Sequence, residues 1–277
     1  MPDFIIGARG HDFGRHTADE LFSSIGSSGY RCTQLAYTKA IEGVKSYADV
    51  TPELVAATKA AIDKHNVSVA VYGTYVELAY ADEERRKGEA AKVISQVANS
   101  KLLNSGCMGS ETTSMEKQPG VTRKEAQEAL LRSLGEIMPV CEEQGVLFAV
   151  ECVYYHSMNT PEAVKMVLDT IASPNLRVIC DFANYIGPEN ASVDAQRRIW
   201  DKVGSLYGEK IAAVHFKGQG FAEMHISTSL EDSVIDYAGG FDMLRQLPQK
   251  VLPVLREEAV PARSASDIAF ISKFCKG

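Results

Sequence analysis

The chain has 277 residues, and its 29 lysines and arginines against 36 aspartates and glutamates give a formal net charge of −7. Hydrophobic residues make up 45% and charged residues 23%, which is the balance of a folded globular protein and excludes a disordered one. The acidic balance argues against a nucleic-acid partner, because such binding depends largely on contacts of Lys and Arg with phosphates. No apolar run approaches the length of a membrane span, so no membrane partner is expected.

The cysteines and the first residues indicate the cellular compartment. The six cysteines form no Cys-x-x-Cys pair, and several lie inside apolar runs. The opening residues Met1, Pro2 and Asp3 do not have the layout of a signal peptide. Reduced thiols and a cytoplasmic location are therefore expected.

Eight short apolar segments alternate with longer amphipathic segments along the chain. The segments expected to form strands are residues 4–9, 30–37, 68–76, 100–106, 146–153, 176–182, 211–216 and 251–256. Several of them are nearly continuous apolar runs, which is typical of parallel strands that are covered on both faces.

Helix-start signals stand between these segments. Thr51 and Thr160 are each followed by a proline and a glutamate, which predicts helices over residues 53–65 and 163–171. Apolar residues at helical spacing predict a long helix over residues 122–143. Ser264 is expected to cap the last helix, with Asp267 in its first turn.

Eight strand–helix units in a chain of this length predict an α/β protein with a single (β/α)₈ TIM barrel domain over residues 1–277. The alternative is an open doubly wound sheet. That fold often carries a glycine-rich phosphate turn after its first strand, whereas here residues 10–14 read Gly-His-Asp-Phe-Gly, which matches neither the dinucleotide nor the P-loop pattern. The barrel is therefore favoured.

Polar residues follow the last four apolar segments, where the active site of such a barrel lies. They are Glu151, Asp181, His215 and Glu257. One such residue alone is readily explained as a salt bridge or a helix cap. Four on adjacent strands converge, and three carboxylates repel each other unless a cation neutralises them. This oxygen-rich set predicts one divalent metal ion, with Mn²⁺ the first choice and Mg²⁺, Co²⁺ or Zn²⁺ as alternatives.

The same segments resemble the xylose isomerase-like superfamily of sugar isomerases and epimerases. The resemblance lies in five short segments, at residues 150–162, 180–184, 214–217, 235–237 and 257. It implies a xylose isomerase-like barrel in which Glu151, Asp181, His215 and Glu257 hold one divalent metal ion, and in which the two glutamates move protons on opposite sides of a bound sugar. Glu258 is an alternative ligand if the strand register differs by one residue.

The chemistry follows from the metal and the carboxylates together. A metal that binds a carbonyl and the neighbouring hydroxyl stabilises the enediolate formed when the α-proton leaves. One carboxylate then serves as the base and the second as the acid.

The sequence departs from the family pattern in two ways. The family often has a substrate-contacting histidine three residues after the aspartate of the sixth strand, and here that residue is Asn184. The branch similar to endonuclease IV needs three zinc ions and several more histidines, whereas this chain has six histidines in total and no Asp-x-His after His215. A three-zinc phosphodiesterase is therefore not expected.

Several further residues are candidates for the pocket. His156, Asn184, Lys217 and His11 are expected to bind substrate, although His156 is equally well read as a loop histidine and Lys217 as the partner of a carboxylate. Weaker candidates, each with a packing or solvation reading, are Asp12, Arg15, Tyr72, Tyr75 and Glu111.

The first functional hypothesis is a metal-dependent isomerase or epimerase that acts on a keto sugar or a hydroxy-keto acid by α-proton transfer. The alternative is a lyase or dehydratase on a keto sugar or keto-glycoside, in which the same enediolate expels a leaving group. A non-catalytic sugar-binding barrel would lack at least one of the four polar strand ends, and none is missing. A homo-oligomer, dimeric or tetrameric, is expected because these barrels commonly pair through their outer helices.

Overall fold

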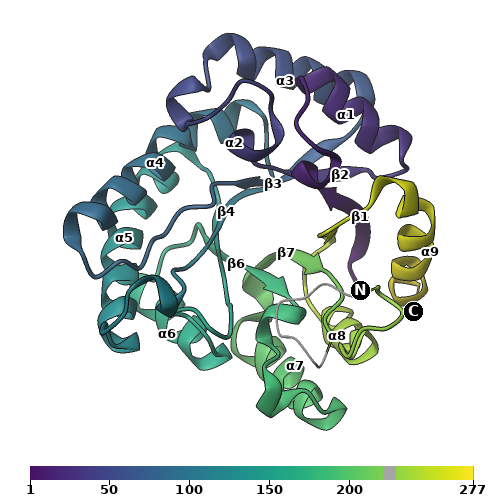
Figure 1. The fold of residues 1–277 in the computed structure, drawn as a ribbon. Coiled ribbons are helices and arrows are strands. Elements are labelled where there is room, and N and C mark those ends of the chain that lie inside the picture. The colour runs from purple at the N-terminus through teal and green to yellow at the C-terminus, as the bar shows by residue number, and fades with distance from the viewer. Residues whose placement is uncertain (221–228, 277) are drawn as a thin grey trace.

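The computed structural model describes residues 1–220 and 229–276, which form a closed barrel of eight parallel strands in the order β1 to β8 (Figure 1). The barrel closes where β1 pairs with β8. The strands are β1 (Asp3–Arg9), β2 (Cys32–Leu35), β3 (Ser68–Gly73), β4 (Cys107–Glu111), β5 (Phe148–Glu151), β6 (Leu176–Asp181), β7 (Ile211–Phe216) and β8 (Val251–Arg256). The predicted TIM barrel is thus confirmed.

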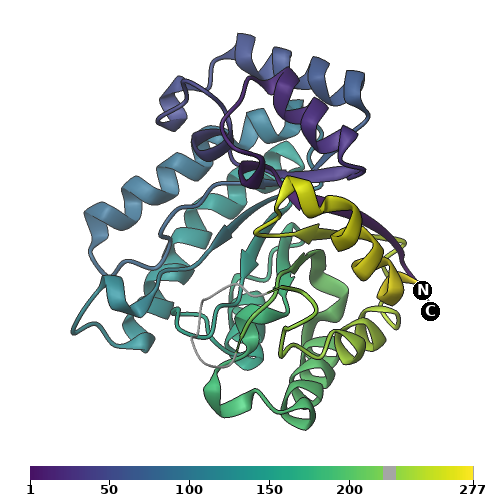
Figure 2. The same cartoon turned by 45° about the vertical axis from the view of Figure 1, so that its right-hand side comes forward.

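Helices follow the strands and cover the outside of the barrel (Figure 1). The α-helices are α1 (Ala18–Ser27), α2 (Tyr37–Ala40), α3 (Pro52–His65), α4 (Glu83–Leu102), α5 (Arg123–Gln144), α6 (Pro161–Ile171), α7 (Val193–Tyr207), α8 (Tyr237–Leu244) and α9 (Ser264–Cys275). Short 3₁₀ helices η1 (Gly10–Phe13) and η4 (Ala183–Tyr185) follow β1 and β6. The two ends of the chain lie side by side in both views (Figures 1 and 2). None of the helices in the described part of the chain has the length and hydropathy of a membrane-spanning segment.

The threonine caps predicted at Thr51 and Thr160 are present, and Thr122, predicted as the first residue of a helix, is a third cap. The side chains of Thr51, Thr122 and Thr160 each accept a hydrogen bond from the backbone amide three residues later. Glu125 completes a capping box at the start of α5, which satisfies two of the unpaired amides of the first turn. The helix starts are therefore fixed by local sequence.

The fourth strand is a correction. Residues 100–106 are not a strand, because α4 continues to Leu102 and the chain then turns before β4 begins at Cys107. In the sequence, the apolar pair Leu102 and Leu103 resembles the start of a strand. In the structure, Leu103 packs in the core at the end of α4. With this register, Glu111 becomes the last residue of β4.

The expected cap of the last helix is also wrong. Helix α9 begins at Ser264 itself, and its N-cap residue is Arg263, which makes no side-chain cap. Asp267 is buried and accepts a hydrogen bond of 2.9 Å from the Arg256 guanidinium of β8. A buried charge needs a partner of opposite sign, so Asp267 is used to tie the helix to the barrel.

Two apolar layers hold the barrel together. A large outer cluster lies between strands and helices and includes Val150, Cys180 and Val214. A small inner cluster fills the barrel, and its buried members are Cys32, Ala70, Val71, Cys107, Ala149, Ile179, Ala213 and Leu255. Small residues are needed inside, since a Cβ on Gly109 would lie 2.6 Å from Ile179 Cδ1. Successive residues of a strand therefore alternate between the two layers.

Candidate active site

Strand alternation brings the candidate ligands to the inside of the barrel. Each lies two residues after a member of the inner cluster, and side chains two residues apart on a strand share a face. The pairs are Ala149 with Glu151, Ile179 with Asp181, Ala213 with His215, and Leu255 with Glu257. The same alternation explains why these polar groups meet above the inner cluster.

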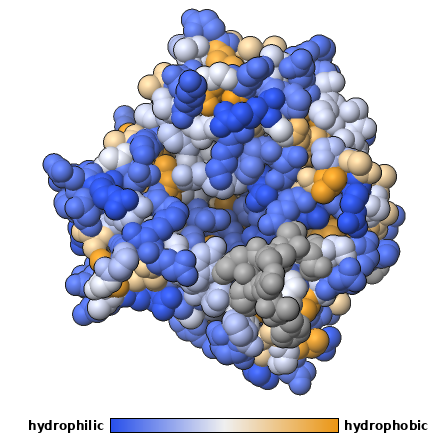
Figure 3. All heavy atoms as spheres, in the orientation of Figure 1, coloured by the Kyte–Doolittle hydropathy of each residue, from blue (hydrophilic) through white to orange (hydrophobic). Residues whose placement is uncertain are grey.

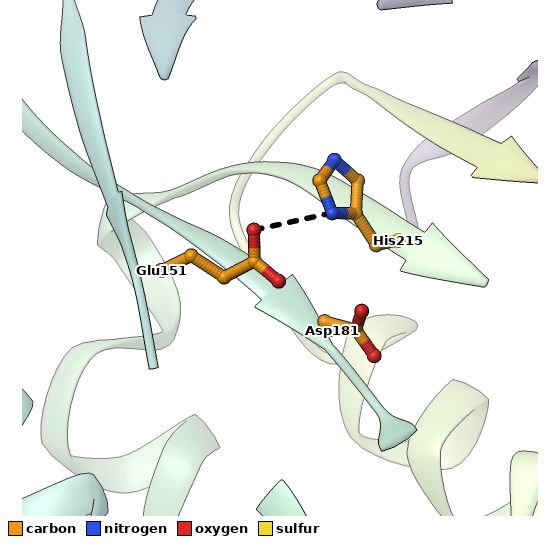
Figure 4. A group of neighbouring side chains, drawn as sticks. All are labelled: Glu151, Asp181 and His215. Carbon is orange, nitrogen blue, oxygen red and sulfur yellow. Dashed lines mark ion pairs between the residues drawn. The ribbon is translucent and has the colours of Figure 1, made fainter. Parts of the chain in front are cut away.

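Glu151, Asp181 and His215 form a compact group, which we call the triad (Figure 4). One ligand atom from each lies within 4.8 Å of the others, and all three residues are buried. His215 Nδ1 is 3.3 Å from Glu151 Oε2. Two carboxylates and an imidazole at this spacing could hold a divalent metal ion.

Glu257 lies beside the triad. Its backbone amide donates to the carbonyl of Phe216, which extends the pairing of β8 with β7 by one residue. Its Oε1 is 3.3 Å from His215 Nδ1. Glu258 has a left-handed backbone with φ of 58°, which turns the chain away from the strand. Of the two neighbouring glutamates, Glu257 is the one in contact with the triad.

The donor set fits a cation. His215 Nε2 is buried and has no hydrogen-bond partner among the described residues, which is unusual for a buried ring nitrogen. Burial opposes the charged imidazole, but the carboxylates of Glu257 and Glu151 raise the pKa of His215 to about 9. Burial also raises the pKa of Asp181 to about 6, against the opposing effect of the Lys217 ammonium. Carboxylates packed this closely need a positive charge among them.

Lys217 is paired with carboxylates, which is the alternative to substrate binding that the sequence left open for this residue. Its Nζ lies 2.8 Å from Asp181 Oδ2 and 3.2 Å from Glu257 Oε2. Burial disfavours the ammonium, but these carboxylates hold the pKa of Lys217 well above its usual value. Burial disfavours the Glu257 carboxylate, but the imidazole of His215, the ammonium of Lys217 and the guanidinium of Arg9, 3.5 Å from Glu257 Oε1, together hold the pKa of Glu257 below its usual range.

Asn184 contacts a carboxylate of the triad. Its Nδ2 donates to Glu151 Oε1 at 2.6 Å, and both groups are buried. Asp181 Oδ1 accepts hydrogen bonds from the backbone amides of Ala183 and Asn184, at 2.8 and 3.1 Å, so it also holds η4 in place. Asn184 was expected to touch substrate, and in this structure it fixes the orientation of Glu151.

Glu111 and His156 lie together on the neighbouring part of the rim. Glu111 pairs in register with Glu151 on the adjacent strand, and it lines the same central cavity as Glu151 and Glu257. Burial and these two carboxylates raise the pKa of Glu111 to about 7. His156 is buried, and its Nε2 is 4.0 Å from Glu111 Oε2. His156 therefore lies beside Glu111, whereas Glu151 is held by Asn184 and His215.

The other side of the mouth carries polar groups from β1, β2 and the segment after β3. His11 stacks edge-on against Tyr75, with ring centroids 5.3 Å apart, and Tyr75 lines the central cavity together with Gln34. Arg9 donates to Asp12 at 2.8 Å. Gln34 and Arg9 were missed, although each follows a small inward residue by two positions, the signal that locates the triad.

Two weaker candidates lie outside the cavity. Arg15 donates to the backbone carbonyls of Thr38 and Val44 and so holds the loop around α2. The hydroxyl of Tyr72 donates to Gln96 of α4, in the outer layer. Both have packing roles.

Three solved structures have the same fold as this chain. The structure is similar to a D-tagatose 3-epimerase-like protein, with a TM-score of 0.78 at 13% identity, covering 98% of this chain and 96% of that one. It is similar to an IOLI protein with a bound zinc atom, with a TM-score of 0.73 at 14% identity over 98% and 99% of the two chains. A third similar structure is the 3-keto-D-glucoside 4-epimerase YcjR from E. coli, with a TM-score of 0.71 at 16% identity over 98% and 99%.

These identities are low, so the three structures support the fold. No curated protein matches the sequence. Residues 22–270 match the family described as "Xylose isomerase-like TIM barrel". That match covers most of the chain, and the chain therefore belongs to the xylose isomerase-like TIM barrel family.

Proposed function

We propose that this protein is a divalent-metal-dependent isomerase or epimerase that acts on a keto sugar or a hydroxy-keto acid by α-proton transfer. The observation that carries the proposal is the convergence of Glu151, Asp181 and His215 from three successive strands, with Glu257 next to them. Three of the structures similar to this chain bear the names of sugar epimerases or of a zinc-containing protein, which supports the same class of reaction.

The four residues would hold one metal ion. Three carboxylates and one imidazole form a hard donor set, which favours Mn²⁺ and also suits Mg²⁺, Co²⁺ or Zn²⁺. A bound divalent ion supplies electrostatic stabilisation of the negative charge that develops on the carbonyl oxygen. The protein then provides the position of the sugar and the proton transfers.

The proton transfers fall to Glu151 and Glu257, which reach the site from β5 and from the end of β8. A base must lie within hydrogen-bond reach of the α-carbon, and an acid on the opposite side returns the proton. Lys217 and Arg9 keep Glu257 ionised, which suits a base. Asn184 holds one oxygen of Glu151 and leaves the other toward His215.

The proposal also covers the domain organisation, the partners and the cellular compartment. We infer one domain over residues 1–277, a small carbohydrate or keto acid as substrate, no nucleic-acid partner, and a homo-oligomer, dimeric or tetrameric, that pairs through outer helices such as α5. The six cysteines are free, five of them buried, which agrees with a reducing compartment such as the cytoplasm.

The proposal is tested by solvent exchange. The protein is loaded with Mn²⁺ and incubated with a panel of keto sugars and keto acids in deuterated water, followed by NMR and mass spectrometry. We expect one deuterium to enter at an α-carbon of the true substrate with no loss of mass from the sugar. Loss of water or of an aglycone would instead assign the lyase reaction. Full activity after removal of metal with a chelator would contradict the proposal.

A further inference from the structure

A second group of polar side chains lies across the mouth of the barrel from the triad. It consists of His11 in η1, Gln34 in β2, Lys39 in α2 and Tyr75 just after β3, and we call these four residues the distal subsite. The elements that carry them are opposite β5, β6 and β7 in the ring of strands (Figure 1). Gln34 and Tyr75 line the same central cavity as Glu151 and Glu257, so this part of the distal subsite borders the cavity that the triad borders.

Tyr75 is the centre of the distal subsite. Its φ of 45° is left-handed, a conformation that is unfavourable for a residue other than glycine. Three contacts hold it there: Gln34 Nε2 donates to its hydroxyl at 2.7 Å, the His11 ring packs edge-on, and Lys39 Nζ lies 3.4 Å from its ring centroid. Strained residues that neighbours hold in place cluster at ligand sites.

Two polar atoms of the subsite have no partner. His11 Nδ1 and Gln34 Oε1 are buried and make no hydrogen bond to any of the residues that the structure describes. Most buried polar atoms in folded proteins are paired, and one that is not is costly. Both atoms can bond a ligand hydroxyl, and the Tyr75 hydroxyl, which accepts from Gln34, can still donate.

The two lysines of the mouth differ in their contacts with carboxylates. Within the described part of the chain, Lys39 has no carboxylate oxygen within 4.0 Å, whereas Lys217 on the other side is held by two. Burial and the positive charges of Arg9 and Lys39 lower the pKa of His11 to about 3, which keeps that ring neutral. Hydrophilic residues surround the centre of this face of the molecule, where an ionised ligand would enter (Figure 3).

We propose that the distal subsite binds an anionic group, a carboxylate or a phosphate, at the end of the substrate remote from the reacting carbonyl. Lys39 supplies the opposite charge, and His11, Gln34 and Tyr75 bind the hydroxyls next to it. This inference rests on the proposed function and narrows its substrate to a hydroxy-keto acid or a keto sugar phosphate. A neutral keto sugar would leave the ammonium of Lys39 with its contact to the Tyr75 ring but with no opposite charge from the substrate.

The test measures binding of matched probes by calorimetry to the Mn²⁺-loaded protein. The probes are the four neutral 2-ketohexoses, the same sugars with a carboxylate at carbon 6, and their 6-phosphates. For at least one of these sugars, we expect one of the two anionic forms to bind about tenfold or more tightly than the neutral sugar. The reason is that hydrogen bonds to charged groups are roughly twice as strong as neutral ones. The tighter of the two anions identifies the natural group. Equal or tighter binding of every neutral sugar would overturn the inference, whereas failure of every probe to bind would contradict the proposed function itself.

Variants assign the preference to Lys39. Lys39 is exposed, so Lys39→Met is expected to fold, and it should reduce the ratio of anionic to neutral affinity to about one. Lys39→Arg keeps the charge and should retain most of the preference. The control is Lys250→Met, which removes the same charge from an exposed position directly before β8, at the opposite end of the barrel. A full preference in Lys39→Met, or an equal loss in Lys250→Met, would show that Lys39 is not the residue responsible.

Discussion

The two halves of the barrel mouth differ in how their polar groups are held. On the β5–β8 side, the triad, Glu257 and Lys217 are joined by contacts of 2.8 to 3.3 Å and are nearly all buried. On the β1–β3 side, Lys39 is exposed and, within the described part of the chain, has no carboxylate oxygen within 4.0 Å. Buried polar atoms without a hydrogen-bond partner among the described residues occur on both sides, at His11 Nδ1 and Gln34 Oε1 here and at His215 Nε2 in the triad. A site that holds an ion needs a rigid shell of donors, whereas a site that binds part of a substrate keeps bonding capacity free. The difference thus separates chemistry from recognition.

The largest expected effect is at Glu257. Glu257→Gln removes a carboxylate that we place both as ligand and as proton carrier, so kcat should fall by about 10²–10⁴-fold while the fold remains. The matched control is Glu258→Gln, one residue away with its backbone turned from the strand, which should leave kcat within about threefold. Steady-state kinetics and circular dichroism check both. If Glu258→Gln is the damaging variant instead, the assignment of the eighth-strand ligand is wrong.

A smaller effect is expected at Asn184, because it acts through Glu151. Asn184→Ala removes the 2.6 Å hydrogen bond and should lower activity about 10- to 100-fold, the usual cost of losing a group that orients a ligand. Asn184→Asp has the same shape but places a negative charge against Glu151 and should be more damaging. Kinetics and Mn²⁺ affinity are measured for both. If both variants are as active as the wild type, this hydrogen bond does not contribute to activity.

Glu111 gives a pH-dependent effect on stability. Because its pKa is raised from 4.5 to about 7 in the folded protein, the folded state takes up its proton more readily than the unfolded state. Its contribution to stability is therefore present below about pH 4.5 and is lost as the pH rises through 7. In metal-free protein, Glu111→Gln should raise the free energy of unfolding relative to the wild type. This increase should become larger as the pH rises from about 4.5 to about 7. The control is Glu116→Gln at an exposed position, whose effect on the unfolding free energy should not change with pH. An effect of Glu111→Gln that is the same at every pH would contradict the account.

The smallest effect is expected at Arg15, which was a pocket candidate in the sequence. Arg15→Met removes hydrogen bonds to loop carbonyls, so the unfolding free energy should fall by about 1–2 kcal/mol. The value of kcat/KM should stay within about twofold, because the side chain does not reach the cavity. Thermal unfolding and kinetics measure the two quantities. A tenfold loss of kcat/KM at unchanged stability would return Arg15 to the site.

The sequence predicted the barrel because its strands are nearly continuous apolar runs and its helix starts carry threonine caps. It predicted Glu151, Asp181 and His215 because polar residues follow several adjacent strands and so converge, which a single salt bridge or helix cap does not explain. The fourth strand was predicted too early in the chain, over residues 100–106, since Leu102 and Leu103 extend the apolar pattern beyond the helix end.

The distal subsite could be predicted only in part, since His11 and Tyr75 were pocket candidates in the sequence and Lys39 was not. Lys39 and Tyr75 lie outside strands, and only tertiary packing brings the ammonium of one over the ring of the other. The left-handed backbone of Tyr75 has no signal in its residue type, because glycine or asparagine is expected at such φ values.

Metal titration tests the central claim most directly. Calorimetry of the chelator-treated protein with Mn²⁺ should give one ion per chain, and Asp181→Asn should weaken that binding at least tenfold while its circular dichroism spectrum stays that of the wild type. A wild-type protein that binds no Mn²⁺, Mg²⁺, Co²⁺ or Zn²⁺ stoichiometrically, or an Asp181→Asn variant that binds as tightly as the wild type, would contradict the account.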